Sequence, residues 1–117
     1  MARTHFSGPL VTTNYGTVTQ ATNKGTAVTL NTAAGAITMN NAALAAGAEV
    51  AFSVVNSKCK ATDVIVAMHS SGGTAGAYLV NTVAASDGGF GIVVSNASAG
   101  SLSEAIVISF VILGVSA

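Results

Sequence analysis

Apolar and polar residues alternate along most of this chain, in short runs separated by turn-forming residues. In residues 49–56 every second side chain is large and apolar, as Val50, Phe52 and Val54 show. Residues 90–96 repeat this alternation. Successive side chains of a strand point to opposite faces, so a period of two places the apolar residues together on one face. The pattern therefore predicts strands that each turn one face toward a core.

Eight segments fit this description, and their regular, turn-rich spacing is typical of a β-sandwich or barrel. The predicted strands are residues 16–20, 27–31, 36–40, 49–56, 63–69, 77–84, 90–96 and 105–114. Asp87, Gly88 and Gly89 predict a tight hairpin, because glycine accepts a positive φ without steric cost. Residues 40–48 are predicted to form at most one helical turn, capped by Asn41 and ended by Gly47.

The first fifteen residues differ from the rest because they show no sustained period. They contain the chain's single proline, Pro9, directly after Gly8. A residue before proline is disfavoured in helical geometry, so this dipeptide favours an extended chain. We expect an N-terminal arm over residues 1–15 and one β-sandwich domain over residues 16–117, a common size for a single domain.

The last predicted strand, residues 105–114, is apolar on both faces, whereas a strand with one wet face should alternate. Its second face is expected either to pack under a loop or to meet another subunit. Only 7% of the residues are charged, against about 25% in typical soluble domains. This scarcity favours a second face that meets another subunit.

The composition speaks against several partner classes. The net charge is zero, and Arg3, Lys24, Lys58 and Lys60 form no basic stripe, which argues against nucleic acid. We expect no membrane contact, because no apolar run approaches the roughly 20 residues of a spanning helix and the N-terminus has no signal-peptide core. Cys59, the single cysteine, is expected to be a free thiol in a turn or to pair between chains. Metal ligands are too few to predict a metal or other cofactor.

No catalytic constellation emerges, so the chain is not predicted to be an enzyme. Asp63 and His69 would lie roughly 20 Å apart at opposite ends of one strand, too far to form a triad with Ser70 or Ser71. Glu49 and Glu104 are the acids whose strands allow them to approach, yet nothing indicates a cleft between two carboxyl groups.

Residues 4–10, Thr-His-Phe-Ser-Gly-Pro-Leu, resemble the N-terminal segment of small structural proteins of tailed bacteriophages. The later segments 28–31, 35–39, 49–56, 61–64, 76–78 and 100–105 resemble phage head-decoration proteins, also called cement proteins. The resemblance covers nearly the whole chain. It implies a jelly-roll-like all-β fold and a homotrimer on the outer surface of the capsid, made in the host cytoplasm. There it would clamp neighbouring subunits of the major capsid protein.

Together these lines predict a structural virion protein whose partners are its own copies and the major capsid protein. The candidate interface residues are Thr4, His5, Phe6, Pro9, Leu10, Ile106, Ile108, Phe110 and Ile112. The alternatives are a trimeric component of a tail fibre, spike or baseplate, or a carbohydrate-binding module. The last of these is disfavoured by the scarcity of aromatic residues, which make up 5% of the chain.

Overall fold

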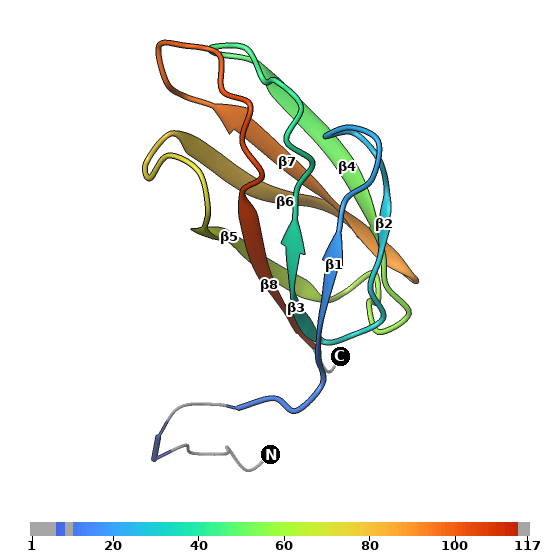
Figure 1. The fold of residues 1–117 in the computed structure, drawn as a ribbon. Helices are drawn as coiled ribbons and strands as arrows, with labels where there is room; N and C mark the ends of the chain where they lie inside the picture. Colours follow the sequence, from blue (N-terminus) through green and yellow to red (C-terminus); the bar gives the residue numbers. More distant parts are fainter. Residues whose placement is uncertain (1–6, 9–10, 115–117) are drawn as a thin grey trace.

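The alternating segments form eight strands in the computed structural model, which describes residues 7–8 and 11–114 (Figure 1). The strands are β1 Tyr15–Thr19, β2 Val28–Thr29, β3 Ala34–Thr38, β4 Glu49–Val55, β5 Val64–Ser71, β6 Tyr78–Ser86, β7 Gly89–Asn96 and β8 Val107–Leu113. Each predicted strand overlaps one of them. The expectation of an all-β sandwich of about eight strands is confirmed.

The strands form two four-stranded sheets, ordered β1-β3-β8-β5 and β2-β4-β7-β6. The pairs within β3-β8-β5 and within β4-β7-β6 are antiparallel. The two outer pairs, β1 with β3 and β2 with β4, are parallel. A jelly roll is an antiparallel architecture, so the expected resemblance to it holds for the two-sheet sandwich and fails for the pairing of β1 and β2.

The core lies between the two sheets and is built from the inward residues of the central strands. Ile37 of β3, Ile108 of β8 and Ile92 of β7 are completely buried. Phe90 and Phe110 meet edge to face across the sheets, with ring centroids 5.4 Å apart. Aromatic pairs in this geometry add about 0.5–1.5 kcal/mol beyond the area they bury. The inter-sheet contact of the central strands therefore holds the sandwich together.

The position of strand β8 shows that the part of the predicted interface assigned to residues 106–112 is wrong. Ile106, Ile108 and Phe110 are 0%, 0% and 4% exposed, so they are core residues and cannot meet a partner. Ile112 is half-buried against the same core. The reason is topological, because β8 pairs with β3 on one side and β5 on the other, and these residues face the opposite sheet. The side chains that point outward from β8 are Val107, Ser109, Val111 and Leu113.

Two buried asparagines close the ends of the central strands. Asn56 follows β4 and Asn96 ends β7, and both are fully buried. The side-chain amide of Asn56 donates to the carbonyl of Thr32 at 2.7 Å, and that of Asn96 donates to the carbonyl of Leu44 at 2.8 Å. Each side-chain oxygen also accepts a backbone N–H two residues later. These bonds satisfy backbone groups that the sheets leave unpaired.

Of the two turn predictions, one is confirmed and the other is wrong. The hairpin at Asp87 and Gly88 forms as predicted, and Gly88 has a φ of 98°. The predicted helical turn in residues 40–48 is wrong. Leu44 instead forms a two-way backbone bridge with Leu102, which ties this segment to the connection between β7 and β8.

Because Ile108 and Val107 lie on opposite sides of β8, their substitution should lower the free energy of unfolding by different amounts. Ile108→Ala should lower the free energy of unfolding by about 2–5 kcal/mol, because it leaves a cavity in the core. Val107→Ala, on the half-exposed outer side, should cost clearly less. Urea denaturation followed by circular dichroism measures both. Equal losses for the two variants would contradict the inward orientation of Ile108.

Candidate interaction surface

The outer side of the β1-β3-β8-β5 sheet, here called the uncharged face, carries apolar side chains from all four strands. Its register aligns Val66 of β5 with Val111 of β8, Val111 with Ala34 of β3, and Ala34 with Tyr15 of β1. This row crosses all four strands. One row further along, Val64 pairs with Leu113. The remaining outward positions of the face hold threonine, serine, alanine, valine and methionine.

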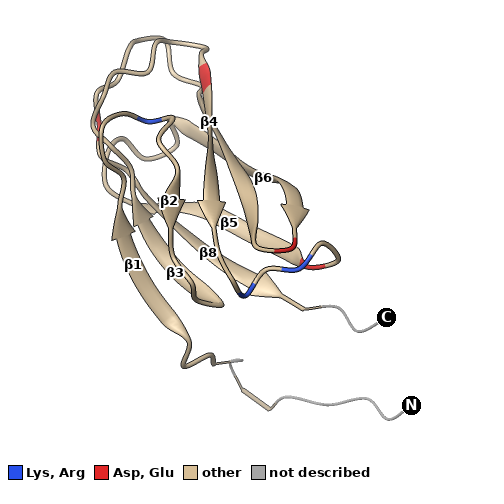
Figure 2. Cartoon of the chain, turned by 90° about the vertical axis from the view of Figure 1, so that its right-hand side faces the viewer, with Lys and Arg blue, Asp and Glu red and all other residues tan. Residues whose placement is uncertain are grey.

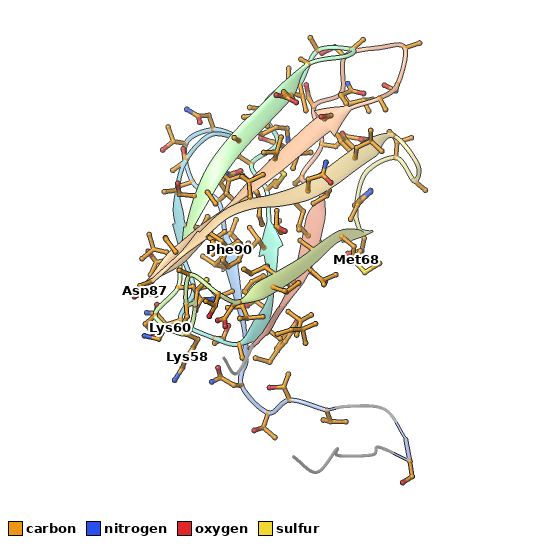
Figure 3. The ribbon with its side chains drawn as sticks, turned by 180° about the vertical axis from the view of Figure 1, so that it is seen from behind. Lys58, Lys60, Met68, Asp87 and Phe90 are labelled. Carbon is orange, nitrogen blue, oxygen red and sulfur yellow. The ribbon has the colours of Figure 1, made fainter. Side chains whose placement is uncertain are left out.

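Several large side chains on this face are open to solvent. Met68, Val64 and Val66 on the edge strand β5 are 59%, 53% and 49% exposed, and Tyr15 on β1 is 60% exposed. Figure 3 shows Met68 directed away from the sandwich, whereas Phe90 lies between the sheets. Monomeric soluble proteins rarely expose contiguous apolar patches larger than a few hundred Å², and such patches mark interaction sites. The uncharged face is therefore the candidate interaction surface.

The charged residues in the described part of the chain lie at the two ends of the sandwich (Figure 2). Lys58, Lys60 and Asp87 gather at one end (Figure 3). Further charges lie toward the other end (Figure 2); Glu49 begins β4, and the ammonium group of Lys24 donates to the carbonyl of Glu104. None points outward from the uncharged face, and neither edge strand of that sheet carries the lysines that usually protect a free edge from pairing. Depletion of charge is also the compositional mark of the centre of protein interfaces.

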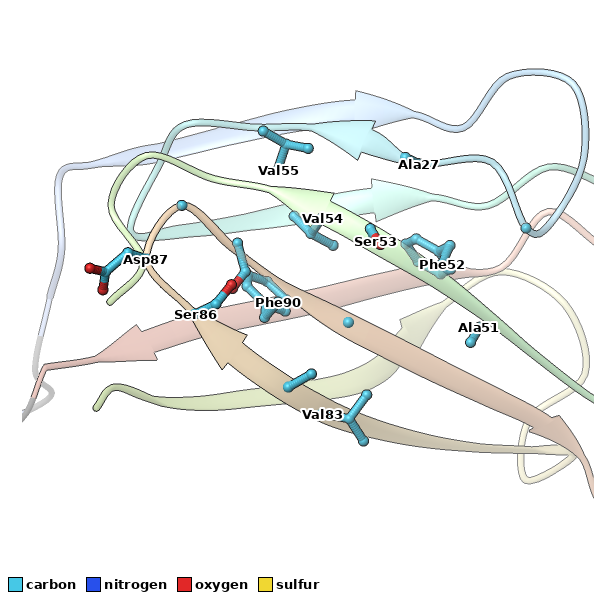
Figure 4. Close-up of a pocket in the computed structure, with 15 residues that line it drawn as sticks. Ala27, Ala51, Phe52, Ser53, Val54, Val55, Val83, Ser86, Asp87 and Phe90 are labelled. Atoms are coloured by element: carbon cyan, nitrogen blue, oxygen red, sulfur yellow. The ribbon is translucent and has the colours of Figure 1, made fainter. Parts of the chain in front are cut away.

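The outer side of the other sheet holds a shallow groove of about 520 Å³ (Figure 4). It exists because Gly91 places no side chain between Ser53 and Val83, and Gly89 places none between Val55 and Ser86. Phe52 and Phe90 border it, but both are 4% exposed and belong to the core. The groove therefore offers no open aromatic ring for a sugar to stack on, which disfavours the carbohydrate-binding alternative.

One polar cluster stands out, centred on Glu104 in the connection between β7 and β8. Its carboxylate accepts hydrogen bonds from the backbone N–H of Thr74 at 3.0 Å, the Thr74 hydroxyl at 2.9 Å and the Tyr78 hydroxyl at 2.8 Å. These bonds, led by that of Tyr78, lower the pKa of Glu104. Burial, followed by the contact with Glu104, raises the pKa of Tyr78 to about 12. The cluster fastens the β5–β6 loop to the body of the sandwich.

The residues of the rejected triad stay apart and have other partners. The ring nitrogen Nε2 of His69 lies 2.6 Å from the carbonyl oxygen of Gly72. Asp63, just before the opposite end of β5, accepts the N–H of Lys60. Ser70 donates to the carbonyl of Val107. Glu49 and Glu104 also have separate surroundings, since Glu104 is bound to Thr74 and Tyr78.

Lys24 is a buried link between loops, a role that sequence reasoning did not predict. It is 4% exposed, and its ammonium group donates to the carbonyl oxygens of Asn40 and of Glu104. The Gln20 side chain donates to the carbonyl of Lys24 and accepts the N–H of Asn40. Desolvation lowers the pKa of Lys24. No local signal distinguishes this lysine from Lys58 and Lys60, which are exposed.

Cys59 is completely buried, and its sulfur lies 3.4 Å from the carbonyl oxygen of Gly89. Burial raises the pKa of its thiol. A buried thiol of this kind is unreactive, so the option of pairing between chains is disfavoured. The described residues contain no group of three or more metal-ligating side chains. No helix long and apolar enough to span a membrane is found among them either.

The remaining predicted interface residues, Thr4, His5, Phe6, Pro9 and Leu10, lie outside the described residues. The chain enters the described sandwich through Val11 and reaches β1 at Tyr15. A groove of about 360 Å³ lies at this entry, lined by Val11, Ala33 and Leu113 among others. Val11 is 77% exposed. The predicted arm therefore joins the sandwich at the margin of the uncharged face.

Comparison with known proteins gives no significant match to a protein family, to a curated protein or to a solved structure.

The Glu104 cluster predicts an acid-dependent loss of stability. Folding lowers the pKa of Glu104 from its ordinary value of 4.5, so ionised Glu104 favours the folded state. This stabilisation is fully present above pH 4.5 and is lost as the pH falls through the lower, folded-state pKa. We expect the Tm of Glu104→Gln to fall less between pH 5 and pH 3 than that of the unchanged protein.

Glu49→Gln is the matched control, because Glu49 is an exposed acid at the start of β4. Its Tm should follow that of the unchanged protein across the same pH range. Thermal unfolding monitored by circular dichroism gives all three curves. An identical acid response of Glu104→Gln and the unchanged protein would contradict a stabilising role for the Glu104 carboxylate.

Proposed function

We propose that this chain is a capsid decoration protein of a tailed bacteriophage, which binds the outside of the head and stabilises contacts between major capsid protein subunits. The observation that carries the proposal is the uncharged face, a broad apolar sheet surface left open on an otherwise well-formed sandwich. Such a surface suits a protein that works as part of an assembly, in which other subunits cover it. The resemblance of the sequence to head-decoration proteins directs the proposal to the phage head.

The mechanism is burial of apolar and hydroxyl-bearing surface, without bond chemistry. Burial of apolar area contributes about 25 cal/mol per Å², and a surface without ions avoids the desolvation penalty that buried charges carry. The exposed charges Lys58, Lys60 and Asp87 lie at one end of the sandwich, where they can remain hydrated while the sheet faces are covered. A static clamp between shell subunits needs this kind of adhesion.

Repetition strengthens each contact. In a homotrimer, as the resemblance implies, three copies of one weak contact act together, since the second and third contacts form at a high effective concentration. The N-terminal arm, with Phe6 and Leu10 as its apolar side chains, adds a further contact to each copy. An extended segment of this kind can also pair with the edge of a neighbouring sheet.

The proposal is tested by mixing the purified protein with undecorated shells of candidate phages. We expect saturable, stoichiometric binding, measured by co-sedimentation, and a higher temperature of shell disruption after binding. Removal of residues 1–10 leaves β1 intact and should weaken binding through loss of the arm contact. The matched control is Lys58→Ser, an exposed change in a turn far in sequence from the arm.

Two outcomes would contradict parts of the proposal. Absence of binding to every shell, together with binding to purified tails, would replace the head assignment with the tail-fibre, spike or baseplate alternative. Unchanged binding after removal of residues 1–10 would show that the arm has no role, while the decoration function would stand.

A further inference from the structure

We propose that the uncharged face is the surface through which copies of this chain contact one another. The inference deepens the proposed function, on whose self-association it rests, and it assigns that self-association to a particular surface. The starting observation is the row of Val66, Val111, Ala34 and Tyr15, which the register aligns across all four strands. Val66 and Tyr15 at its two ends are 49% and 60% exposed, Val111 is half-buried and Ala34 is buried.

The absence of charge on the uncharged face indicates which kind of partner can bind there. A different protein is usually recognised through complementary charges that set specificity and orientation, and this face offers none. Interfaces between permanently associated identical chains are the more hydrophobic class, similar to a domain core cut in half. An uncharged surface also meets its own copy without like-charge repulsion. A second copy of this chain is therefore the occupant that the composition favours.

The area of the uncharged face bears on whether a second copy of this chain can bind there. The four strands are 5, 5, 7 and 8 residues long, and with about 4.8 Å between neighbours they give a flat footprint of roughly 400 Å². A stable interface buries about 800 Å² on each partner, so the face supplies about half of what is needed. The described chain enters at Val11, at the margin of this face, and residues 1–10 precede it in the sequence. The proposal assigns the other half of the area to this N-terminal segment.

The groove beside Val11 gives this second contribution a location. It lies between the entry segment and the end of β8, and Ala33 and Leu113 line it. The predicted arm carries Phe6 and Leu10 within a few residues of this point. Apolar side chains of the arm are the right chemistry to fill the groove.

A charge placed at the centre of the exposed apolar edge tests the inference. Met68→Lys introduces an ammonium group on the uncharged face, at a side chain that is 59% exposed. Burying an unpaired charge is strongly unfavourable, and we expect the dissociation constant of the association to rise roughly 100-fold or more. Leu79→Lys is the matched control, because Leu79 is also 59% exposed and lies on β6, the corresponding edge strand of the other sheet.

Light scattering after size exclusion gives the mass of each variant, and circular dichroism confirms that each one folds. We expect the unchanged protein and Leu79→Lys to have the mass of two or more chains. Met68→Lys should have the mass of one 11.4 kDa chain. The inference is wrong if the unchanged protein is a monomer at tens of micromolar, or if Met68→Lys keeps the full mass.

The same samples, added to undecorated shells, separate this inference from the proposed function. A monomeric unchanged protein that still binds shells would overturn the inference alone. An association that Met68→Lys breaks and Leu79→Lys retains, with no binding to any shell, would overturn the proposed function and support the inference.

Discussion

The position of β8 at the centre of its sheet is the constraint on which the rest of the structure depends. It pairs with β3 and β5, so its backbone is fully paired on both sides. Its inner side chains, Ile108 and Phe110, pack against the facing sheet and complete the core. Its outer side chains form the middle of the uncharged face. One strand therefore supplies both the stability of the sandwich and the surface proposed for association.

Periodicity predicted the strands because a half-buried strand must alternate, and all eight expected segments form strands. Periodicity could not show which side of β8 faces the core, because that strand is apolar on both sides. The candidates Ile106, Ile108, Phe110 and Ile112 lie on the side with the larger residues, and burial favours that side for the core. Ser109 was the available signal, because an unpaired hydroxyl is costly inside a core. It marks the side shared with Val107 and Val111 as the outer one.

The polar links at the ends of the sandwich were beyond sequence reasoning for a different reason. Lys24 donates to the carbonyl oxygen of Glu104, eighty residues later in the chain. Glu104 in turn receives hydrogen bonds from Thr74 and Tyr78. Such pairs form only after the sheets have brought distant loops together, so local patterns carry no trace of them. Their effect is to convert charges that look solvated in the sequence into fixed connections between loops.

The distribution of these groups bears on how a charge-poor protein can associate in one way only. Apolar contact supplies affinity but little orientation, because many arrangements of two smooth surfaces bury similar areas. Here Lys58, Lys60 and Asp87 gather at one end of the sandwich, and Glu49 begins β4. A copy that slides along the strands would bring charged ends over the neighbouring apolar sheet, and burying those ions would oppose the shift. The charges thus limit the register of the association from outside the contact, while the uncharged face provides its adhesion.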